Sequence, residues 1–361
     1  MKICYLSDAN NPHTIKWCEY FRDQGNEISL ISFSHGNIEG VKVFSLDKER
    51  FLRKNDLFKL SYLGKLFKVR KIIREVEPDI LHAHYASSYG FFAAHIKHNT
   101  KIISAWGTDI YEFPKKSILH KKLLESNLRR VDVLFSTSNC MANEMKKYTS
   151  KDILITPFGV DLKKFHPQEK NSKEELVIGS VKTLNPKYGI DVLIRAFSQV
   201  QLQTKRRLKL LLVGKGEQKE ELEQLVRKLE ISESVSFTGF LSGKQLIEAY
   251  ASMDLVVIPS YSESFGVAAI EAQAVGLPVI VSDAEGLLES TSPGETSLVF
   301  PAGNVDLLTR RIFEYIDNPL LMKKHGEKGR NFVEENFDIV DNFSKVKMIY
   351  MQLIKGKGSA N

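Results

Sequence analysis

The chain alternates between strand-like and helix-like segments in two consecutive series. In the first series the strand-like segments are short runs rich in Ile, Leu and Val, at 2–7, 27–33, 41–46, 79–84, 101–105, 132–136 and 152–156. Helix-like segments at 13–24, 56–76, 86–98, 116–130 and 138–148 separate most of them. Strands that are apolar throughout are buried on both faces, and short helical links pair them in parallel through right-handed crossovers. The pattern therefore predicts a doubly wound α/β sheet.

A polar stretch at 166–175, which contains Pro167, predicts a linker before the alternation restarts. The second series has strand-like runs at 176–181, 208–213, 235–238, 255–258 and 278–282, and helix-like runs at 189–200, 217–230, 242–251, 265–275, 304–317, 319–335 and 338–355. We therefore expect two Rossmann-like domains, at 1–165 and 176–337. Open α/β sheets bind ligands at the carboxyl ends of their strands, and we expect these ends to meet across a cleft. Many proteins share this outline, so it does not by itself define a function.

Composition excludes several protein classes. The 361 residues are 43% hydrophobic and 26% charged, as in ordinary globular proteins. No apolar run is long enough to span a bilayer, and the run after Lys2 is too short for a secretory signal. Cys4, Cys18 and Cys140 lack metal-ligand spacing, which predicts reduced, buried thiols in a cytoplasmic protein.

The excess of positive over negative charge is confined to the first half of the chain. The net charge is +7, and residues 1–170 hold 28 Lys and Arg against 19 Asp and Glu, whereas residues 171–361 hold 23 against 25. The excess gathers at 51–75 and 115–130. Along the helix at 56–74, lysines alternate with apolar residues. These apolar residues are Leu57, Leu60, Leu63, Leu66 and Phe67. That pattern is typical of a membrane-surface helix, or of the solvated face of a surface helix. No aromatic stacking pattern interleaves the basic residues, so we expect no nucleic-acid partner.

The segment 259–280 carries the strongest chemical signal. It reads as a strand end, a loop with Glu263, a helix with Glu271, and a Gly-Leu-Pro stop. We expect Gly266 in the first helical turn, where unpaired amides and the helix dipole favour an anion such as a diphosphate. Glu271 lies on an otherwise apolar helix, so its carboxylate needs a partner, either a sugar hydroxyl or a neighbouring protein group.

This segment resembles the E-x7-E motif of the family 4 retaining glycosyltransferases, with Ser-Phe-Gly after the first Glu. Residues 156–167 resemble the family's N-G-V-D element, with Phe158 in place of Asn. Residues 179–191 resemble the segment whose Arg and Lys, five apart, grip the donor diphosphate. Lys182 stands here for the Arg, which keeps the charge but loses the guanidinium fork. Residues 211–217 and 237–240 complete a similarity that covers nearly the whole chain and is strongest from 153 to 283.

Motifs in the first half match the family more loosely. His82 and His84 end a strand and share a face. The resemblance implies that His84 lines the donor sugar, and His82 is most simply a core histidine. A zinc site with His95 or His98 is an alternative. Where the family has a Gly-rich loop, residues 7–13 have no glycine and offer asparagine amides such as Asn11.

The resemblance implies a GT-B fold, in which the C-terminal helix at about 338–361 packs on the first domain. It also implies a role for each site residue. A sugar would pass with retention from a UDP- or GDP-sugar to a glycan, lipid-linked or small-molecule acceptor, in cell-surface polysaccharide or glycoconjugate assembly. His84 and Glu263 would be catalytic. Donor-binding residues would be Lys182, Lys187, Phe240, Leu241, Ser264, Phe265, Gly266, Val267 and Glu271. Acceptor-binding residues would be Asn11, Trp106 and Asp109, although Trp106 and Asp109 also suit a core aromatic and a loop cap.

We expect no cofactor and no metal. The chain contains no Asp-x-Asp, and Lys182, Lys187 and the helix start at 265–267 can stabilise the leaving diphosphate instead. Two other functions fit the same outline, a nucleotide-sugar 2-epimerase and an inactive nucleotide-sugar-binding module. We expect the protein in the cytoplasm, with the basic first domain in contact with the inner face of the cell membrane as a further possibility.

Overall fold

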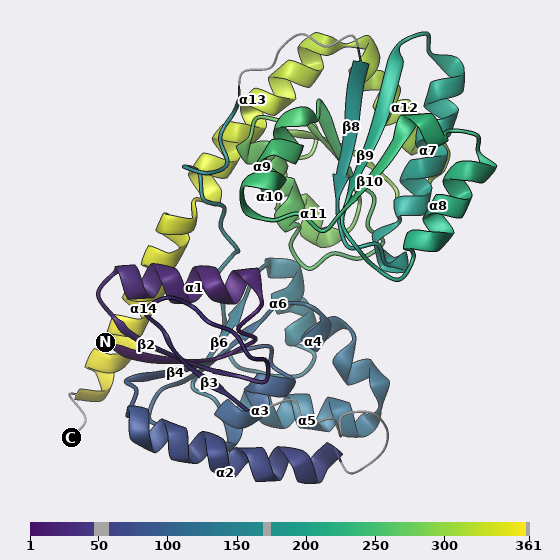
Figure 1. The fold of residues 1–361 in the computed structure, drawn as a ribbon. Coiled ribbons are helices and arrows are strands. Elements are labelled where there is room, and N and C mark those ends of the chain that lie inside the picture. The colour runs from purple at the N-terminus through teal and green to yellow at the C-terminus, as the bar shows by residue number, and fades with distance from the viewer. Residues whose placement is uncertain (47–57, 169–174, 359–361) are drawn as a thin grey trace. The chain divides into compact units, whose positions relative to one another are not determined.

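The computed structural model describes residues 1–46, 58–168 and 175–358, and the chain forms two compact units (Figure 1). The N-terminal unit comprises Met1–Thr156 and Phe343–Asn361, and the C-terminal unit comprises Pro157–Asn342. Residues 169–174 of the predicted linker lie outside the described residues, and its remainder belongs to the C-terminal unit. Each unit is a parallel sheet with helices on both faces, as the alternation predicted.

The N-terminal unit contains a seven-stranded sheet in the order β3-β2-β1-β4-β5-β6-β7. Its strands are β1 (Lys2–Leu6), β2 (Glu27–Ser32), β3 (Lys42–Ser45), β4 (Ile80–His84), β5 (Lys101–Ala105), β6 (Val133–Ser136) and β7 (Ile153–Ile155). All pairs are parallel, and the order reverses between β1 and β4. Every residue of β4 is buried, as expected for a strand covered on both faces.

Two helical layers cover this sheet. Its helices are α1 (Pro12–Asp23), α2 (Phe58–Val76), α3 (Ser88–His95), α4 (Thr108–Tyr111), α5 (Ile118–Arg129), α6 (Asn139–Met145) and most of α14 (Ile339–Gly358). On one face α1 and α14 pack through aromatic rings, with Trp17 and Phe343 at 4.9 Å and Phe21 and Tyr350 at 5.2 Å between ring centroids. Helices α2, α3 and α5 cover the other face (Figure 1).

The C-terminal unit contains a six-stranded parallel sheet in the order β10-β9-β8-β11-β12-β13. Its strands are β8 (Glu175–Val181), β9 (Arg207–Val213), β10 (Val235–Gly239), β11 (Leu255–Ile258), β12 (Val279–Ser282) and β13 (Ser297–Phe300). Its helices are α7 (Ile190–Gln203), α8 (Lys219–Lys228), α9 (Gly243–Ser252), α10 (Val267–Ala274), α11 (Glu285–Glu289), α12 (Val305–Asp317) and α13 (Pro319–Asn336). Separate hydrophobic clusters fill the two sides of the sheet.

Two features of the C-terminal unit differ from the sequence-based expectation. Strand β13 and helix α11 were not predicted, because both lie in a stretch rich in Ser, Thr, Gly and Glu that reads as a loop. Helix α10 was expected from residue 265, but it begins at Val267 and Gly266 is its N-cap. Among the described residues, no helix combines the length and hydropathy that a membrane span requires.

Candidate active site

Glycines bring the backbone loops together at the carboxyl edge of the C-terminal sheet. A Cβ atom on Gly214, after β9, would lie 1.8 Å from the carbonyl oxygen of Lys182, after β8. On Gly216 it would lie 2.1 Å from the carbonyl oxygen of Leu184. These positions accept only glycine, since no side chain fits between backbones this close. The donor-binding residues predicted from the sequence lie on the loops and short turns that follow β8, β10 and β11, except Val267 and Glu271, which lie on α10.

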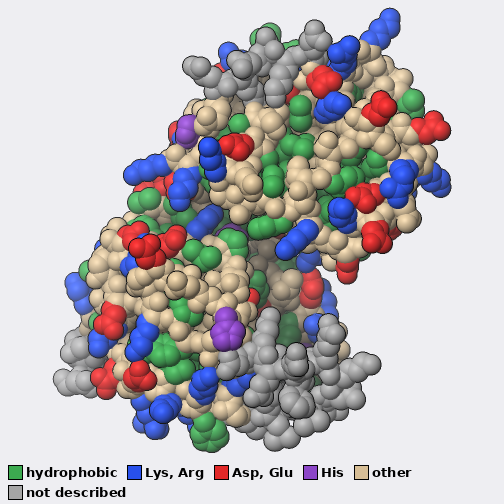
Figure 2. Space-filling model, in the orientation of Figure 1, with side chains coloured by type: hydrophobic (Ala, Val, Ile, Leu, Met, Phe, Trp, Pro, Cys, Tyr) green, Lys and Arg blue, Asp and Glu red, His purple; other side chains and the backbone are tan. Residues whose placement is uncertain are grey.

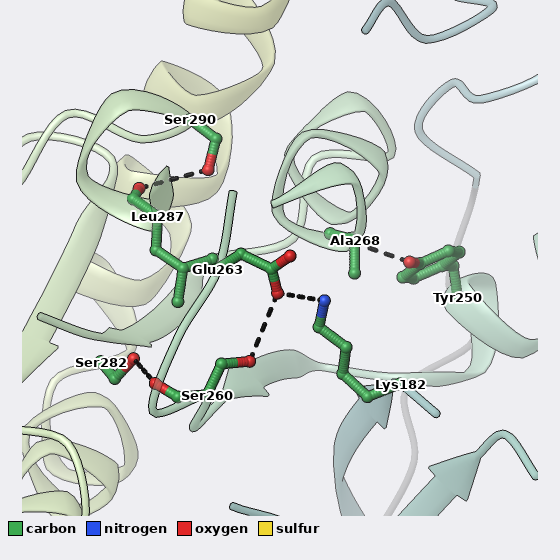
Figure 3. Close-up of polar contacts among 8 residues, drawn as sticks. All are labelled: Lys182, Tyr250, Ser260, Glu263, Ala268, Ser282, Leu287 and Ser290. Carbon is green, nitrogen blue, oxygen red and sulfur yellow. Dashed lines mark hydrogen bonds and ion pairs between the residues drawn. The ribbon is translucent and has the colours of Figure 1, made fainter. Parts of the chain in front are cut away.

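Lys182 and Glu263 form an ion pair in this edge (Figure 3). Both side chains are only 11% exposed, so the pair is largely shielded from water. The Ser260 hydroxyl also donates to the Glu263 carboxylate, at 3.4 Å. The sequence assigned Lys182 to the diphosphate and Glu263 to the sugar, and the structure places the two charges in direct contact.

Tyr188 holds both predicted phosphate-binding lysines. The Nζ atom of Lys182 lies 4.7 Å from the centroid of its ring, and that of Lys187 lies 5.2 Å away. Cations at this distance are attracted to an aromatic face, so the ring helps to hold both ammonium groups at this edge. Sequence reasoning missed Tyr188, although its place beside Lys187 was a signal.

The turn before α10 has a left-handed backbone at Gly266, with φ of +100°. A Cβ atom there would lie 2.6 Å from Ser290 Oγ and 2.8 Å from a methyl carbon of Leu287. The preceding Phe265 is buried, and its ring packs edge-on against those of Phe158 and Phe337. Phe265 therefore anchors the turn in the core and offers only its backbone to a ligand. The Ala269 amide already donates to the Gly266 carbonyl at 2.9 Å, so the amides of Val267 and Ala268 are the ones that precede the hydrogen-bond ladder of α10.

Glu271 is the fifth residue of α10 and is 9% exposed. The buried Tyr250 of α9 donates its hydroxyl hydrogen to Glu271 Oε2 at 3.1 Å. Burial, and secondarily the Glu271 charge, raise the pKa of Tyr250 well above its usual range. A tyrosine is therefore one protein partner of this carboxylate, and sequence reasoning did not identify it.

Phe240 and Leu241 follow β10 at the same edge. The Phe240 side chain is 58% exposed, and the Lys215 ammonium lies 5.3 Å from its ring centroid. Leu241 is partly buried against the hydrophobic cluster that also contains Phe265. An exposed aromatic ring beside a cation is a surface on which a planar group can stack.

In the N-terminal unit, His84 lies at the end of β4 and is fully buried. Its Nδ1 atom shares a hydrogen bond with Ser7 Oγ at 3.1 Å, and its ring stacks on Trp106 with centroids 4.3 Å apart. Burial, followed by the charges of His82 and His13, lowers the pKa of His84 well below its usual range. The imidazole is therefore neutral at pH 7, and its Nε2 atom has no hydrogen-bond partner among the described residues.

His82 is a core histidine. One ring nitrogen bonds to the Tyr350 hydroxyl of α14 and the other to Ser104 Oγ at 2.7 Å. Burial lowers the pKa of His82 to about 3. His98 bonds to the backbone carbonyls of Pro78 and Thr100, and the described residues contain no group of three possible ligands. The zinc alternative therefore has no support in the described part of the chain.

The predicted acceptor residues have local partners. Asn11 caps α1 and accepts from the His13 amide at 2.8 Å. Asp109 is buried and accepts from the amides of Ala86 at 2.7 Å, Gly107 at 2.8 Å and Trp106 at 3.2 Å. Burial raises the pKa of Asp109, while these amide bonds oppose the rise. Asp109 thus has the loop-capping contacts that the sequence left open, and its contact with an acceptor stays a prediction.

Similar proteins agree with this arrangement. Residues 161–332 match the family model of glycosyl transferases group 1, and residues 2–138 match that of glycosyl transferase 4-like proteins. An uncharacterized glycosyltransferase of Methanocaldococcus jannaschii is 27% identical over 298 residues, 81% of each chain. Sucrose-phosphate synthase from Thermosynechococcus elongatus superposes with a TM-score of 0.85 at 19% identity, covering 99% of this chain and all of that one.

Anabaena HepE in complex with UDP-glucose superposes with a TM-score of 0.78 at 19% identity, covering 99% of this chain and all of that one. These structures share two parallel-sheet α/β domains with this chain, which is the GT-B fold. The two family models together span both sheets, and the E-x7-E segment lies within the first of them. The chain is therefore an enzyme that belongs to the family 4 glycosyltransferases.

Proposed function

We propose that the enzyme transfers a sugar, with retention, from a UDP- or GDP-sugar to a glycan, lipid-linked or small-molecule acceptor. The observation that carries this proposal is the grouping of Lys182, Lys187 and Glu263 beside the start of α10. The lysines and the first amides of α10 would bind the diphosphate and stabilise the charge that develops as it leaves. Glu263 would then exchange its lysine partner for sugar hydroxyls.

The remaining residues would complete the site. Glu271, oriented by Tyr250, would bind the donor ribose, while Phe240, Leu241 and the turn Ser264–Val267 would hold the nucleotide. The neutral His84 imidazole would bond to the sugar through Nε2, its unpartnered nitrogen. Asn11, Trp106 and Asp109 would line the acceptor side. The departing phosphate would help to deprotonate the acceptor, without a metal ion or other cofactor.

We propose UDP or GDP as the nucleotide from the family resemblance, and UDP is supported by HepE, a protein of the same fold that is known in complex with UDP-glucose. Assembly of cell-surface polysaccharide or glycoconjugate, on the cytoplasmic side of the cell membrane, is the proposed setting. The three cysteines are free and buried, which suits a reducing compartment.

A thermal-shift panel of UDP-, GDP- and ADP-sugars tests donor binding. A donor at a hundredfold excess over its dissociation constant should stabilise the fold by about 2.7 kcal/mol. NMR of the donor with and without an acceptor pool then separates the candidate functions. An epimerase would convert the donor alone, and an inactive binding module would be stabilised without converting anything. Loss of transfer in EDTA with recovery in Mg²⁺ would contradict the metal-independent scheme.

A further inference from the structure

Helix α5 begins with two adjacent apolar side chains that face solvent. Ile118 is 75% exposed and Leu119 is 63% exposed. The helix start is well defined, because the Ser117 side chain caps it and bonds to the His120 ring at 2.7 Å. Later in the helix Leu124 and Leu128 are fully buried, so α5 has a normal core face and the exposed pair lies apart from it. Large apolar residues that are grouped on a surface mark an interaction site.

Lysines surround this pair. Lys115 and Lys116 precede it, Lys121 and Lys122 follow it, and all four are exposed. Lys121 reaches Glu125 at 4.0 Å, whereas the other three form no ion pair with any described residue. The segment 115–122 therefore combines four cations with two exposed aliphatic side chains and contains no acidic residue.

Helix α2 belongs to the same helical layer, since α3 contacts both α2 and α5. Leu66, which the sequence pattern offered for membrane contact, is buried, as are Val69, Ile72 and Ile73. Phe67, in contrast, is 70% exposed. Leu57 lies outside the described residues, and the side chains of Leu60 and Leu63 are not described either. The apolar face of α2 therefore packs in the core over its described length.

The outer face of α2 is basic. Lys68, Lys71 and Arg74 are exposed beside Phe67, and Figure 2 shows Lys and Arg side chains with a protruding hydrophobic group over this helix. The acidic Glu75 on the same helix is paired with Lys42 at 2.9 Å. The α2 face thus adds positive charge to the layer but offers few apolar groups for insertion.

We propose that the start of α5 docks on an anionic lipid surface, with Ile118 and Leu119 inserted and the surrounding lysines on the headgroups. Exposed apolar groups and flanking cations are the two contributions that peripheral membrane binding combines. Helix α5 follows β5 through Trp106 and α4, so the docking element lies at the edge of the sheet that carries the predicted acceptor residues. If the acceptor is lipid-linked, which rests on the proposed function, docking brings its headgroup to that edge.

Co-sedimentation of the full chain with vesicles tests this inference. We expect binding to phosphatidylglycerol–phosphatidylcholine vesicles that increases with the anionic fraction and decreases with salt. The double variant Ile118→Ser, Leu119→Ser should weaken partitioning by about tenfold or more, because two aliphatic groups no longer insert. The matched control is Leu202→Ser, Leu320→Ser, two leucines of the C-terminal unit that are 84% and 81% exposed. The control should bind like the original protein.

Replacing Lys115, Lys116 and Lys122 by Gln should reduce the salt dependence. Equal binding to purely phosphatidylcholine vesicles, equal pelleting of the Ile118/Leu119 variant, or no binding at all would overturn the inference. Donor-dependent thermal stabilisation, measured on the same samples, should be the same in every variant. That readout tests the proposed function separately, since the docking residues lie outside the donor-binding unit.

Discussion

At the scale of single residues, the Lys182–Glu263 pair links donor binding to the chemistry. Lys182 cannot give its full charge to a diphosphate while it neutralises Glu263. An arginine could serve both partners through its fork, but a lysine presents one ammonium group. The Glu263 carboxylate therefore competes with the donor diphosphate for the Lys182 ammonium group.

Replacing Glu263→Gln should tighten the binding of a free nucleoside diphosphate by about tenfold, because it removes a competing anion. Sugar transfer should fall by about a hundredfold or more, because the carboxylate no longer holds the donor sugar. Isothermal titration and initial rates measure the two effects. Glu295→Gln is the matched control, since Glu295 pairs with Lys328 but is exposed. Unchanged or weaker nucleotide affinity in Glu263→Gln would show that the pair does not compete.

The Tyr250–Glu271 hydrogen bond allows a second test. Tyr250→Phe keeps the buried ring but removes the hydroxyl that orients the carboxylate, so the KM for the donor should rise several-fold while kcat changes little. The free energy of unfolding should fall by about 1 kcal/mol. Tyr315→Phe is the control, because the buried Tyr315 hydroxyl bonds to the Val279 carbonyl and to His325 in the same unit, away from the predicted donor-binding residues. An equal KM in the two variants would assign Tyr250 a purely structural role.

At the scale of elements, the start of α10 was predicted less accurately than the strands around it. The sequence pattern places it at residue 265, whereas the helix begins at Val267 with the left-handed Gly266 as its N-cap. The Ser-Phe-Gly-Val order predicted a helix start in this region, but periodicity does not show that Phe265 points into the core and leaves Gly266 as the cap. The loops around the site could be placed because each follows an apolar strand. The contact of Tyr250 with Glu271 could not be placed, because it joins two helices 21 residues apart. Tyr188 lies close in sequence to Lys182 and Lys187, but no periodic pattern shows that its ring faces both ammonium groups.

Gly266→Ala measures the importance of this cap. The added Cβ meets Ser290 and Leu287, and alanine is strained in the left-handed backbone that Gly266 adopts, so the free energy of unfolding should fall by about 2–3 kcal/mol and donor affinity should weaken. Gly243→Ala is the control, because Gly243 also has a positive φ, +53°, but no atom lies within 4 Å of its added Cβ. Urea titration of both variants separates the steric effect from the backbone effect. Equal losses would mean that the loop around Ser290 relaxes.

At the scale of the whole molecule, the order of elements was predicted well, because both sheets are built from buried parallel strands with a clear composition. Strand β13 was missed because it directly follows the turn-rich residues 290–296, where the sequence pattern predicts a loop. The sequence also gave no direct evidence that Tyr350 of α14 would bond to His82, since the two are 268 residues apart. That contact depends on where the C-terminal helix packs on the first sheet, which local sequence patterns do not predict.

Buried histidines should make the fold sensitive to acid. Burial lowers the pKa of His13 and of His82 to about 3, so both are neutral when folded but bind a proton near pH 6.5 when unfolded. The contribution of the two neutral histidines to the free energy of unfolding is complete above pH 6.5. It is lost as the pH falls from 6.5 towards 3, by about 1.4 kcal/mol per pH unit for each histidine. Urea titrations between pH 7 and pH 5 should show this slope. His82→Gln should reduce the slope by the share of that histidine, whereas His166→Gln, at an exposed histidine, should leave it unchanged.

Helix α14 begins in the C-terminal unit and supplies Phe343 and Tyr350 to the N-terminal one. The ribosome therefore releases all seven strands of the first sheet long before the rings that complete one of its faces. During that interval Trp17 and Phe21 lack the rings that they pack against in the folded protein. Apolar surface that is exposed during synthesis favours aggregation, so we expect the partly synthesised chain to bind chaperones. A chain that ends at residue 342 would contain every residue of the C-terminal unit, but the N-terminal unit would lack residues 343–361 and the rings that cover one face of its sheet.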